Sequence, residues 1–177
     1  MRFILNILIT SLSMSLFIAA MISYKNHQKE QTTNIEIKTS QDIEIEEIEG
    51  IDKTKKLVPK GAKALLPNEV DELTYLVKAT NKSPNNKKLE LEPKTIKCVS
   101  KQEEDILQKC LLITNEYETD EDTNYKKYNN DNKPNINSKK SIYVKTTISL
   151  NEKSIISKKL ISNQEFTIIL SFNLADN

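Results

Sequence analysis

The residues best placed to do chemistry are four oxygen-bearing side chains in the most polar part of the chain. They lie in the run DEDTNYKKYNND, where Asp120, Asp122 and Asn124 alternate and Asp131 is the twelfth residue. Oxygen ligands at this spacing form the calcium loop of an EF-hand. However, the sixth position is Tyr125 instead of glycine, the twelfth is not glutamate, and no flanking helices are evident. The pattern favours a plain hydrophilic loop, with a weak calcium-binding module as the alternative.

Other metal-binding or nucleophilic side chains are few. His27 is the only histidine, which excludes a histidine-based metal cluster and disfavours a histidine-dependent triad. Cys98 and Cys110 are twelve positions apart, and neither belongs to a CxxC motif. In an exported domain they could form a disulfide; otherwise they are two small buried hydrophobic residues. No cofactor is expected.

Aspartate and glutamate are abundant, but none is set among apolar residues beside a partner in the way that raises a catalytic pKa. The acidic run at 42–49 and the lysine-rich run at 53–63 are typical of a solvated strand face followed by a charged loop. The formal net charge is only +1, which disfavours a nucleic-acid binder. The sequence therefore predicts no catalytic residues, no enzymatic activity and no nucleic-acid partner.

The elements that position these residues begin with a hydrophobic segment. Phe3–Ser23 carries no charge and is long enough to cross a bilayer as a helix. It also fits a secretory signal, but Ile18 and Met21 are poor matches to the small residue expected three positions before a cut. We expect an uncleaved signal-anchor over 1–24 and a polar linker over 25–33. The rest of the chain would then lie outside the cytoplasm, on a single-pass membrane protein, or be secreted if the signal is cleaved.

The remainder of the chain, 34–177, is predicted to be an all-β domain. Apolar and polar residues alternate over 73–79, 142–150 and 166–174, and more briefly near 35–37, 43–45, 89–91 and 96–98. Pro59, Gly61 and Pro67 mark turns before the first long strand. Six to eight short strands separated by turns indicate an immunoglobulin-like antiparallel β-sandwich behind one N-terminal hydrophobic helix.

Three segments depart from the strand pattern. Gln102–Leu107 has a helical composition, and 151–164 suits a short helical connection or an irregular loop. The segment 116–140 has almost no aliphatic residues, so we expect a hydrophilic insertion that is a long loop or disordered.

The order of these pieces resembles a known group of proteins. The block KLVPKGAKALLPNEVDELTYLVKA and the ending VKTTISLNEKSIISKKLISNQEFTIILSFNL are similar to small exported β-sandwich proteins of low-G+C Gram-positive bacteria and the wall-less Mollicutes. The resemblance covers roughly Thr32 to Leu174, apart from the 116–140 insertion, and implies no catalytic residues. A more distant likeness is to camelysin-like and biofilm-matrix fibre proteins, but Ser23-Tyr24-Lys25 stands where those carry an aromatic motif.

These observations favour a non-enzymatic, membrane-tethered module with a structural, adhesion or assembly role at the cell surface. The alternative is a small single-pass accessory subunit of a larger membrane complex. A protein partner or self-association is expected, because unpaired edge strands accept strands from other chains. Ile142–Leu150 or Phe166–Leu174 would serve if either lay at an edge, although burial inside the sandwich is expected for both.

Overall fold

The computed structural model describes residues 31–61, 66–92, 95–119, 122–131, 133–151 and 165–176. The chain divides into two units, Met1–Glu30 and Gln31–Asn177, and the description that follows concerns the second. The predicted hydrophobic helix and the 152–164 connection lie outside the described residues. Within the described ranges, no helix has both the length and the apolar character needed to cross a membrane.

The first sheet is built around the last strand of the chain. β12 (Glu165–Ala175) lies between β1 (Thr32–Thr39) on one side and β6 (Lys87–Leu91) and β7 (Thr95–Lys97) on the other, and β10 (Asn135–Ile136) pairs with β6. β1 runs parallel to β12, in an unbroken register from Thr32 opposite Glu165 to Thr39 opposite Phe172. The other pairings in this sheet are antiparallel.

The second sheet is entirely antiparallel. Its strand order is β2 (Ile43–Glu49), β5 (Glu72–Asn81), β11 (Ser141–Leu150), β8 (Leu111–Thr119) and β9 (Asp122–Lys127). A separate parallel pair, β3 (Lys56–Leu57) with β4 (Glu69–Val70), precedes β5. Gly61 lies in the turn after β3, and its φ of 82° is the left-handed conformation that glycine favours.

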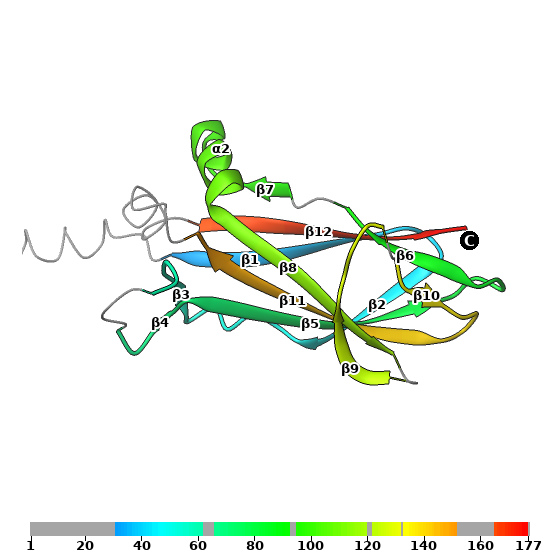
Figure 1. Ribbon diagram of the computed structural model, residues 1–177. Helices are drawn as coiled ribbons and strands as arrows, with labels where there is room; N and C mark the ends of the chain where they lie inside the picture. The colour runs from blue at the N-terminus through cyan, green and yellow to red at the C-terminus, as the bar shows by residue number, and fades with distance from the viewer. Residues whose placement is uncertain are drawn as a thin grey trace, which may run out of the picture. The chain divides into compact units, whose positions relative to one another are not determined.

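One hydrophobic core lies between the two sheets, which Figure 1 shows as separate layers. The alternation of β5, β11 and β12 places every second side chain in this core. Phe166, Ile168 and Phe172 from β12 are at most 1% exposed and contribute much of its volume. Val77 of β5 and Val144 of β11 are fully buried on the opposite layer.

The three long strands predicted from alternation are confirmed as β5, β11 and β12, and the all-β class is confirmed with them. The pairing of β1 with β12 is parallel, which differs from the expectation of a purely antiparallel arrangement. Alternation determines which face of a strand is buried but carries no information about the direction of its neighbour.

α2 (Lys101–Cys110) confirms and extends the predicted helical segment. Ser100 caps it: its hydroxyl accepts from the Glu103 N–H at 3.3 Å, and the Ser100 N–H donates to the Glu103 carboxylate at 3.2 Å. This capping box satisfies two donors at the start of the helix. Leu107 and Cys110 turn inward, which holds α2 against the core.

The expectation of a loop over 116–140 is wrong for most of the described residues. β8 continues to Thr119, β9 occupies Asp122–Lys127, and β10 forms a short pair with β6. Four consecutive residues of β9, Asn124 to Lys127, are exposed. A strand at the margin of a sheet gains its main-chain hydrogen bonds from one neighbour without burying apolar side chains. The lack of aliphatic residues in 116–140 therefore did not exclude strands there.

Candidate functional site

The predicted calcium ligands are placed on and around β9. The Asp122 Oδ1 accepts hydrogen bonds from the N–H of Asn124 at 3.1 Å and from its side-chain amide at 3.2 Å. The Asp122 Oδ2 lies 2.8 Å from the ammonium of Lys126, and the hydrogen bond from Lys126 is the main cause that lowers the pKa of Asp122. Asp120 lies outside the described residues.

Asp131 lies on the turn beyond the other end of β9, where its N–H donates to the Asn129 side chain at 3.0 Å. An extended strand of six residues spans about 17 Å, so β9 separates Asp131 from Asp122 and Asn124. Among the described residues, no three His, Cys, Asp or Glu side chains are grouped so that they could hold a metal ion. The structure thus brings Asp122 and Asn124 together and leaves Asp131 apart from them.

The two cysteines flank α2. Cys98 precedes the helix and Cys110 ends it, and both are free thiols. A ten-residue helix spans about 15 Å, well beyond the reach of a disulfide, so the disulfide alternative is wrong. Burial, with smaller contributions from the Glu103 and Glu104 charges, raises the pKa of Cys98 to about 11. A thiol that stays protonated is a poor nucleophile, and both cysteines serve as small hydrophobic residues.

Tyr75 and Glu47 form a contact that the sequence did not indicate. The Tyr75 hydroxyl, on a side chain only 3% exposed, donates to the Glu47 Oε2 at 2.7 Å. Burial first, and then the hydrogen bond and charge of Glu47, raise the pKa of Tyr75 well above its usual range. Glu47 sits where the register of β2 against β5 shifts, so the tyrosine fixes an irregular point of the strand. The alternation of β5 predicts an inward Tyr75, but Glu47 resembles its solvated neighbours in sequence.

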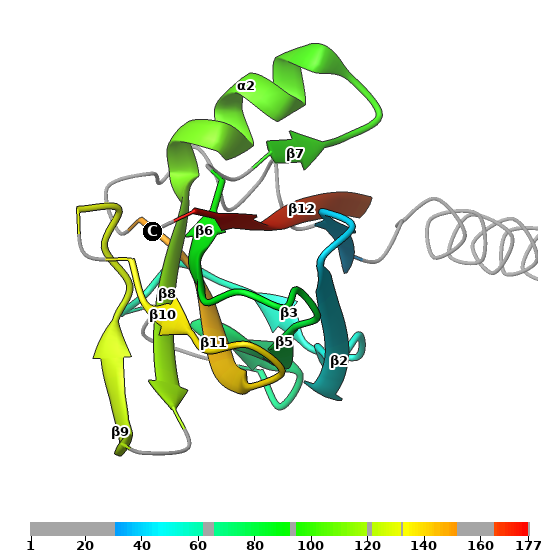
Figure 2. The same cartoon turned by 90° about the vertical axis from the view of Figure 1, so that its right-hand side faces the viewer.

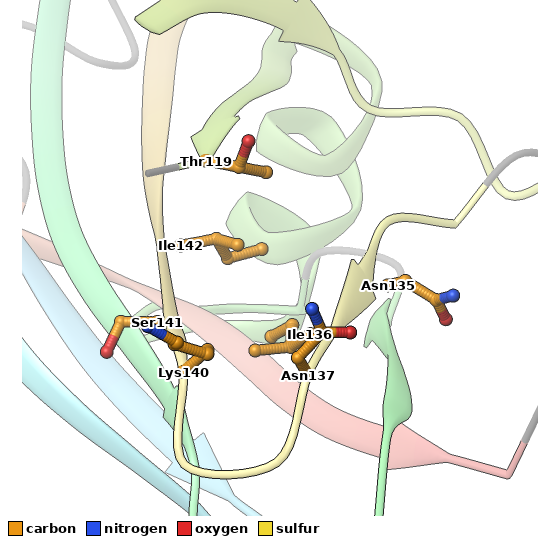
Figure 3. A pocket seen from close by; sticks show the side chains of 7 residues that line it. All are labelled: Thr119, Asn135, Ile136, Asn137, Lys140, Ser141 and Ile142. Carbon is orange, nitrogen blue, oxygen red and sulfur yellow. The ribbon is translucent and has the colours of Figure 1, made fainter. Parts of the chain in front are cut away.

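The described cavities are small or open. One of about 130 Å³ lies between β10 and the start of β11 and is shown in Figure 3. Its lining residues are Thr119, Asn135, Ile136, Asn137, Lys140, Ser141 and Ile142. Lys140 is the single ionisable side chain among them, so this cavity offers no acid–base pair. It is large enough for a few water molecules.

A wider groove of about 550 Å³ runs along the first half of β8. Leu91, Leu111 and Leu170 contribute to its lining. Tyr128 crosses between the layers here, and its hydroxyl accepts the N–H of Leu91 at 3.0 Å. The groove is therefore a gap between the sheets that Tyr128 bridges. Its lining side chains do not gather around one position where a substrate could react.

The edges of the sheets are the remaining candidates. β11 lies between β5 and β8, and β12 lies between β1 on one side and β6 and β7 on the other, so the expected burial of 142–150 and 166–174 is confirmed. Over the described part of the chain, the outermost strands are β1 and β10 in one sheet, where β7 also pairs only with β12, and β2 and β9 in the other. β10 has only two residues, and β9 has six with a register shift against β8, whereas β1 and β2 have eight and seven residues.

β1 has the more regular outer edge. The N–H of Ser40 donates to the carbonyl of Phe172 at 3.2 Å, so the even-numbered residues direct their main-chain groups towards β12. The odd-numbered residues therefore direct theirs outward, and we call the outward N–H and C=O groups of Thr33, Ile35, Ile37 and Thr39 the β1 edge. The side chains of Ile35 and Ile37 pack against the core but are only half-buried.

Unpaired polar atoms also gather on this strand. Within the described residues, three buried side-chain oxygens lack a hydrogen-bond partner: the Gln31 Oε1, the Thr33 Oγ1 and the Ser40 Oγ. All three belong to β1 or to the residues at its two ends. Buried polar groups are normally paired, so this strand is the least satisfied part of the described structure.

Comparison with protein-family models, curated proteins and solved structures found no match for this chain. The choice of site therefore depends on the residues and the geometry. The β1 edge combines free main-chain groups, half-buried apolar side chains and unpaired polar atoms, and it is the candidate functional site of the described structure.

Proposed function

We propose that this protein is an exported, membrane-tethered, non-enzymatic module with a structural, adhesion or assembly role at the cell surface, and that it works by pairing its β1 edge with another strand. The observation that supports this role is the regular β1 edge, with its outward main-chain groups and half-buried isoleucines. Strand addition uses such groups for affinity and alternate side chains for specificity.

The tether is the uncharged stretch Phe3–Ser23. A segment of this length and composition crosses a bilayer as a helix, and it would hold the domain that begins at Gln31 close to the membrane. Cleavage of the segment would release the same domain as a secreted protein. Either outcome exposes the domain outside the cytoplasm, where strand pairing between copies or with other surface proteins takes place.

The two-sheet architecture supports the sandwich part of the proposal. In immunoglobulin domains the last two strands belong to one sheet. Here β11 and β12 belong to different sheets, so the immunoglobulin likeness we propose concerns the general plan and not the strand order. Both sheets carry lysine–glutamate pairs on their solvated faces, such as Lys97 with Glu36 and Lys78 with Glu46, which keep such a domain soluble.

The proposal is tested on the full-length chain with an epitope tag after Asn177. Intact cells are treated with a membrane-impermeant biotin reagent and an added protease, and the membranes are then washed with carbonate. We expect the tag to be labelled and digested in intact cells and the undigested chain to stay in the washed membranes. A cytoplasmic protein carrying the same tag is the control. A tag that is protected until the cells are broken would overturn the proposal.

A second arm addresses the partner. The tagged chain is purified in mild detergent and every co-purifying chain is identified by mass spectrometry. Recovery of no other chain supports a module that does not depend on a larger membrane complex. Stoichiometric recovery with a set of other membrane proteins would instead make it an accessory subunit.

A further inference from the structure

We propose that the β1 edge pairs with the β1 edge of a second copy, antiparallel, about a two-fold axis that passes through Ile37. The pairing would join the two first sheets into one continuous sheet. This inference deepens the proposed function, on which it rests, by naming the partner and the register. It is carried by the main-chain geometry of β1, by the placement of its two charges, and by a contrast with β2.

The main-chain groups set which registers are available. Thr33, Ile35, Ile37 and Thr39 direct their N–H and C=O groups away from β12. In an antiparallel pair, residues that exchange two hydrogen bonds lie directly opposite each other. An odd-numbered residue of one copy must therefore lie opposite an odd-numbered residue of the other, and a two-fold axis must pass through one residue of β1.

Charge selects among these axes. An axis through Glu36 places that glutamate opposite its own copy, and an axis through Lys38 does the same with lysine. Like charges directly opposite each other destabilise a strand pair. An axis through Ile37 places Glu36 opposite Lys38 of the second copy, twice, by symmetry.

An axis through Ile35 avoids like charges but needs the N-terminal half of the strand. There Thr33 is only 2% exposed, and Gln31 donates from its side chain to the carbonyl of Leu57 at 3.3 Å. Towards the other end, Lys38 and Thr39 are exposed. The accessible half of β1 is therefore the half that an axis through Ile37 uses.

The side chains fit this register on both faces. On the core side, Ile37 meets Ile37 of the second copy and Ile35 meets Thr39, which covers isoleucines that are half-buried in one copy alone. On the outer side, Asn34 of one copy lies opposite Ser40 of the other. Both side chains are polar, and the Asn34 side-chain amide donates to Glu165 at 3.1 Å within one copy.

The other long edge strand lacks these features. β2 follows β1 around the same side of the two layers, as the blue and blue-green strands in Figure 2 show. Its register shifts between Glu47 and Glu49, and Ile48 is the extra, exposed residue. β2 also carries four glutamates and no lysine. Bulges and charges are the usual devices that keep an edge from pairing, and β2 has both.

The symmetry predicts a closed assembly. A two-fold interface uses the same patch on both copies, so each dimer consumes both of its β1 edges. Continued growth would need a second free edge. β2 is blocked, β9 is interrupted in its register with β8, and β7 and β10 have only three and two residues. The product is therefore a dimer and not a fibre.

The test uses the purified full-length chain in mild detergent, with its mass measured by light scattering and its dissociation constant by sedimentation equilibrium. We expect a dimer that Glu36→Lys and Lys38→Glu each weaken about tenfold or more, because each places like charges opposite each other twice. Glu36→Lys combined with Lys38→Glu in one chain should restore the dimer. An equimolar mixture of the two single variants should also associate, because two positive charges then face two negative ones.

The controls separate pairing from folding. Glu46→Lys makes the same charge change on β2, and Lys97→Ala removes the partner of Glu36 within one copy; neither should change the dissociation constant. Thr39→Pro removes one outward N–H while its exposed side chain leaves the core unchanged, and should abolish the dimer with the melting temperature retained. Hydrogen exchange at Ile37 should slow on dimer formation in the wild-type chain and in the double variant, and should not slow in either single variant.

Several outcomes would overturn the inference. A monomer at all concentrations would do so, as would a dimer that survives every charge variant, since that would place the contact elsewhere, for example in residues 3–23. Loss of association in both single variants without rescue in the double variant or in the mixture would also overturn it. A surface-exposed, anchored monomer would leave the proposed function in place, whereas an intracellular dimer with the charge-swap behaviour would reject the proposed function and retain the dimer.

Discussion

β1 and β2 follow each other in the chain, both alternate isoleucine with charged residues, and each ends up at the margin of a sheet, yet their edges differ. β1 pairs with β12 without interruption and carries one glutamate and one lysine. β2 pairs with β5, is interrupted at Ile48 and carries four glutamates. Equal hydrophobic alternation therefore does not make equal edges: the spacing of charges and one extra residue decide which edge is open.

The first prediction weakens the strand that supports each edge. Phe172→Ala removes a 1% exposed ring from β12, at the residue opposite Thr39, and should lower the free energy of unfolding by about 3–5 kcal/mol. Val77→Ala is the matched change under β2 and should cost about 2 kcal/mol. Denaturant unfolding measures both values.

Hydrogen exchange then shows whether the two edges are independent. Phe172→Ala should speed exchange more in β1 than in β2, and Val77→Ala should do the reverse, because each cavity lies beside one edge strand. Equal loss of protection in both strands for both variants would mean that the sheets open as one unit, and the comparison of separate edges would fail.

The second prediction concerns the irregular point of β2. Tyr75→Phe removes the hydroxyl that donates to Glu47 at 2.7 Å and should cost about 1–2 kcal/mol, because the bond joins a buried donor to a charged acceptor. Tyr143→Phe, on the solvated face of β11, is the control and should change the free energy of unfolding by less than about 0.5 kcal/mol. The same cost for both variants would show that Glu47 does not depend on the tyrosine.

The sequence could predict part of this comparison. Alternation over 73–79, 142–150 and 166–174 predicted three central strands, since a two-residue period with β-branched residues has few other solutions. The isoleucines near 35–37 and 43–45 predicted two further strands. Nothing in those isoleucines indicated the parallel pairing of β1 with β12 or the extra residue at Ile48, because both depend on the partner strand.

The candidate site was less accessible to prediction. The spacing of Asp120, Asp122, Asn124 and Asp131 predicts a calcium loop only if the chain turns between them, and β9 is extended there instead. The Glu47–Tyr75 contact joins residues 28 positions apart. An open edge is a property of the assembled sheet, so β1 could be recognised only once β12 was known to lie on its other side.

The third prediction uses alkaline pH, with one titrating group associated with each sheet. Cys98 follows β7, which pairs with β12, and Tyr75 lies beneath β2. Burial is the first cause that raises both pKa values, that of Cys98 to about 11 from 9.0. Above the ordinary pKa the unfolded chain binds fewer protons than the folded chain, so stability falls as pH rises.

The expected result is a stability that is fully present below about pH 9 and declines above it. Each group contributes a slope of at most about 1.4 kcal/mol per pH unit. Cys98→Ala should remove the part of the decline between pH 9 and 11, and Tyr75→Phe should remove a part that begins above pH 10. The measurement is urea unfolding across pH 7.5 to 11, and a decline that is unchanged in both variants would contradict the assignment.

The smallest expected effect concerns the exposed ion pairs of the two edges. Lys97 pairs with Glu36 of β1 at 3.2 Å, and Lys82 pairs with Glu44 of β2; all four side chains are at least two-fifths exposed. Lys97→Ala and Lys82→Ala should each cost no more than about 0.5 kcal/mol, and about 1 M salt should erase the difference from the wild-type chain. If both variants lower the free energy of unfolding by the same small amount, the ion pairs of the two edges contribute alike to folding. An effect on association that is seen only when Glu36 or Lys38 is changed must then come from contact between copies. A cost several times larger at one edge would instead place the contrast within a single copy.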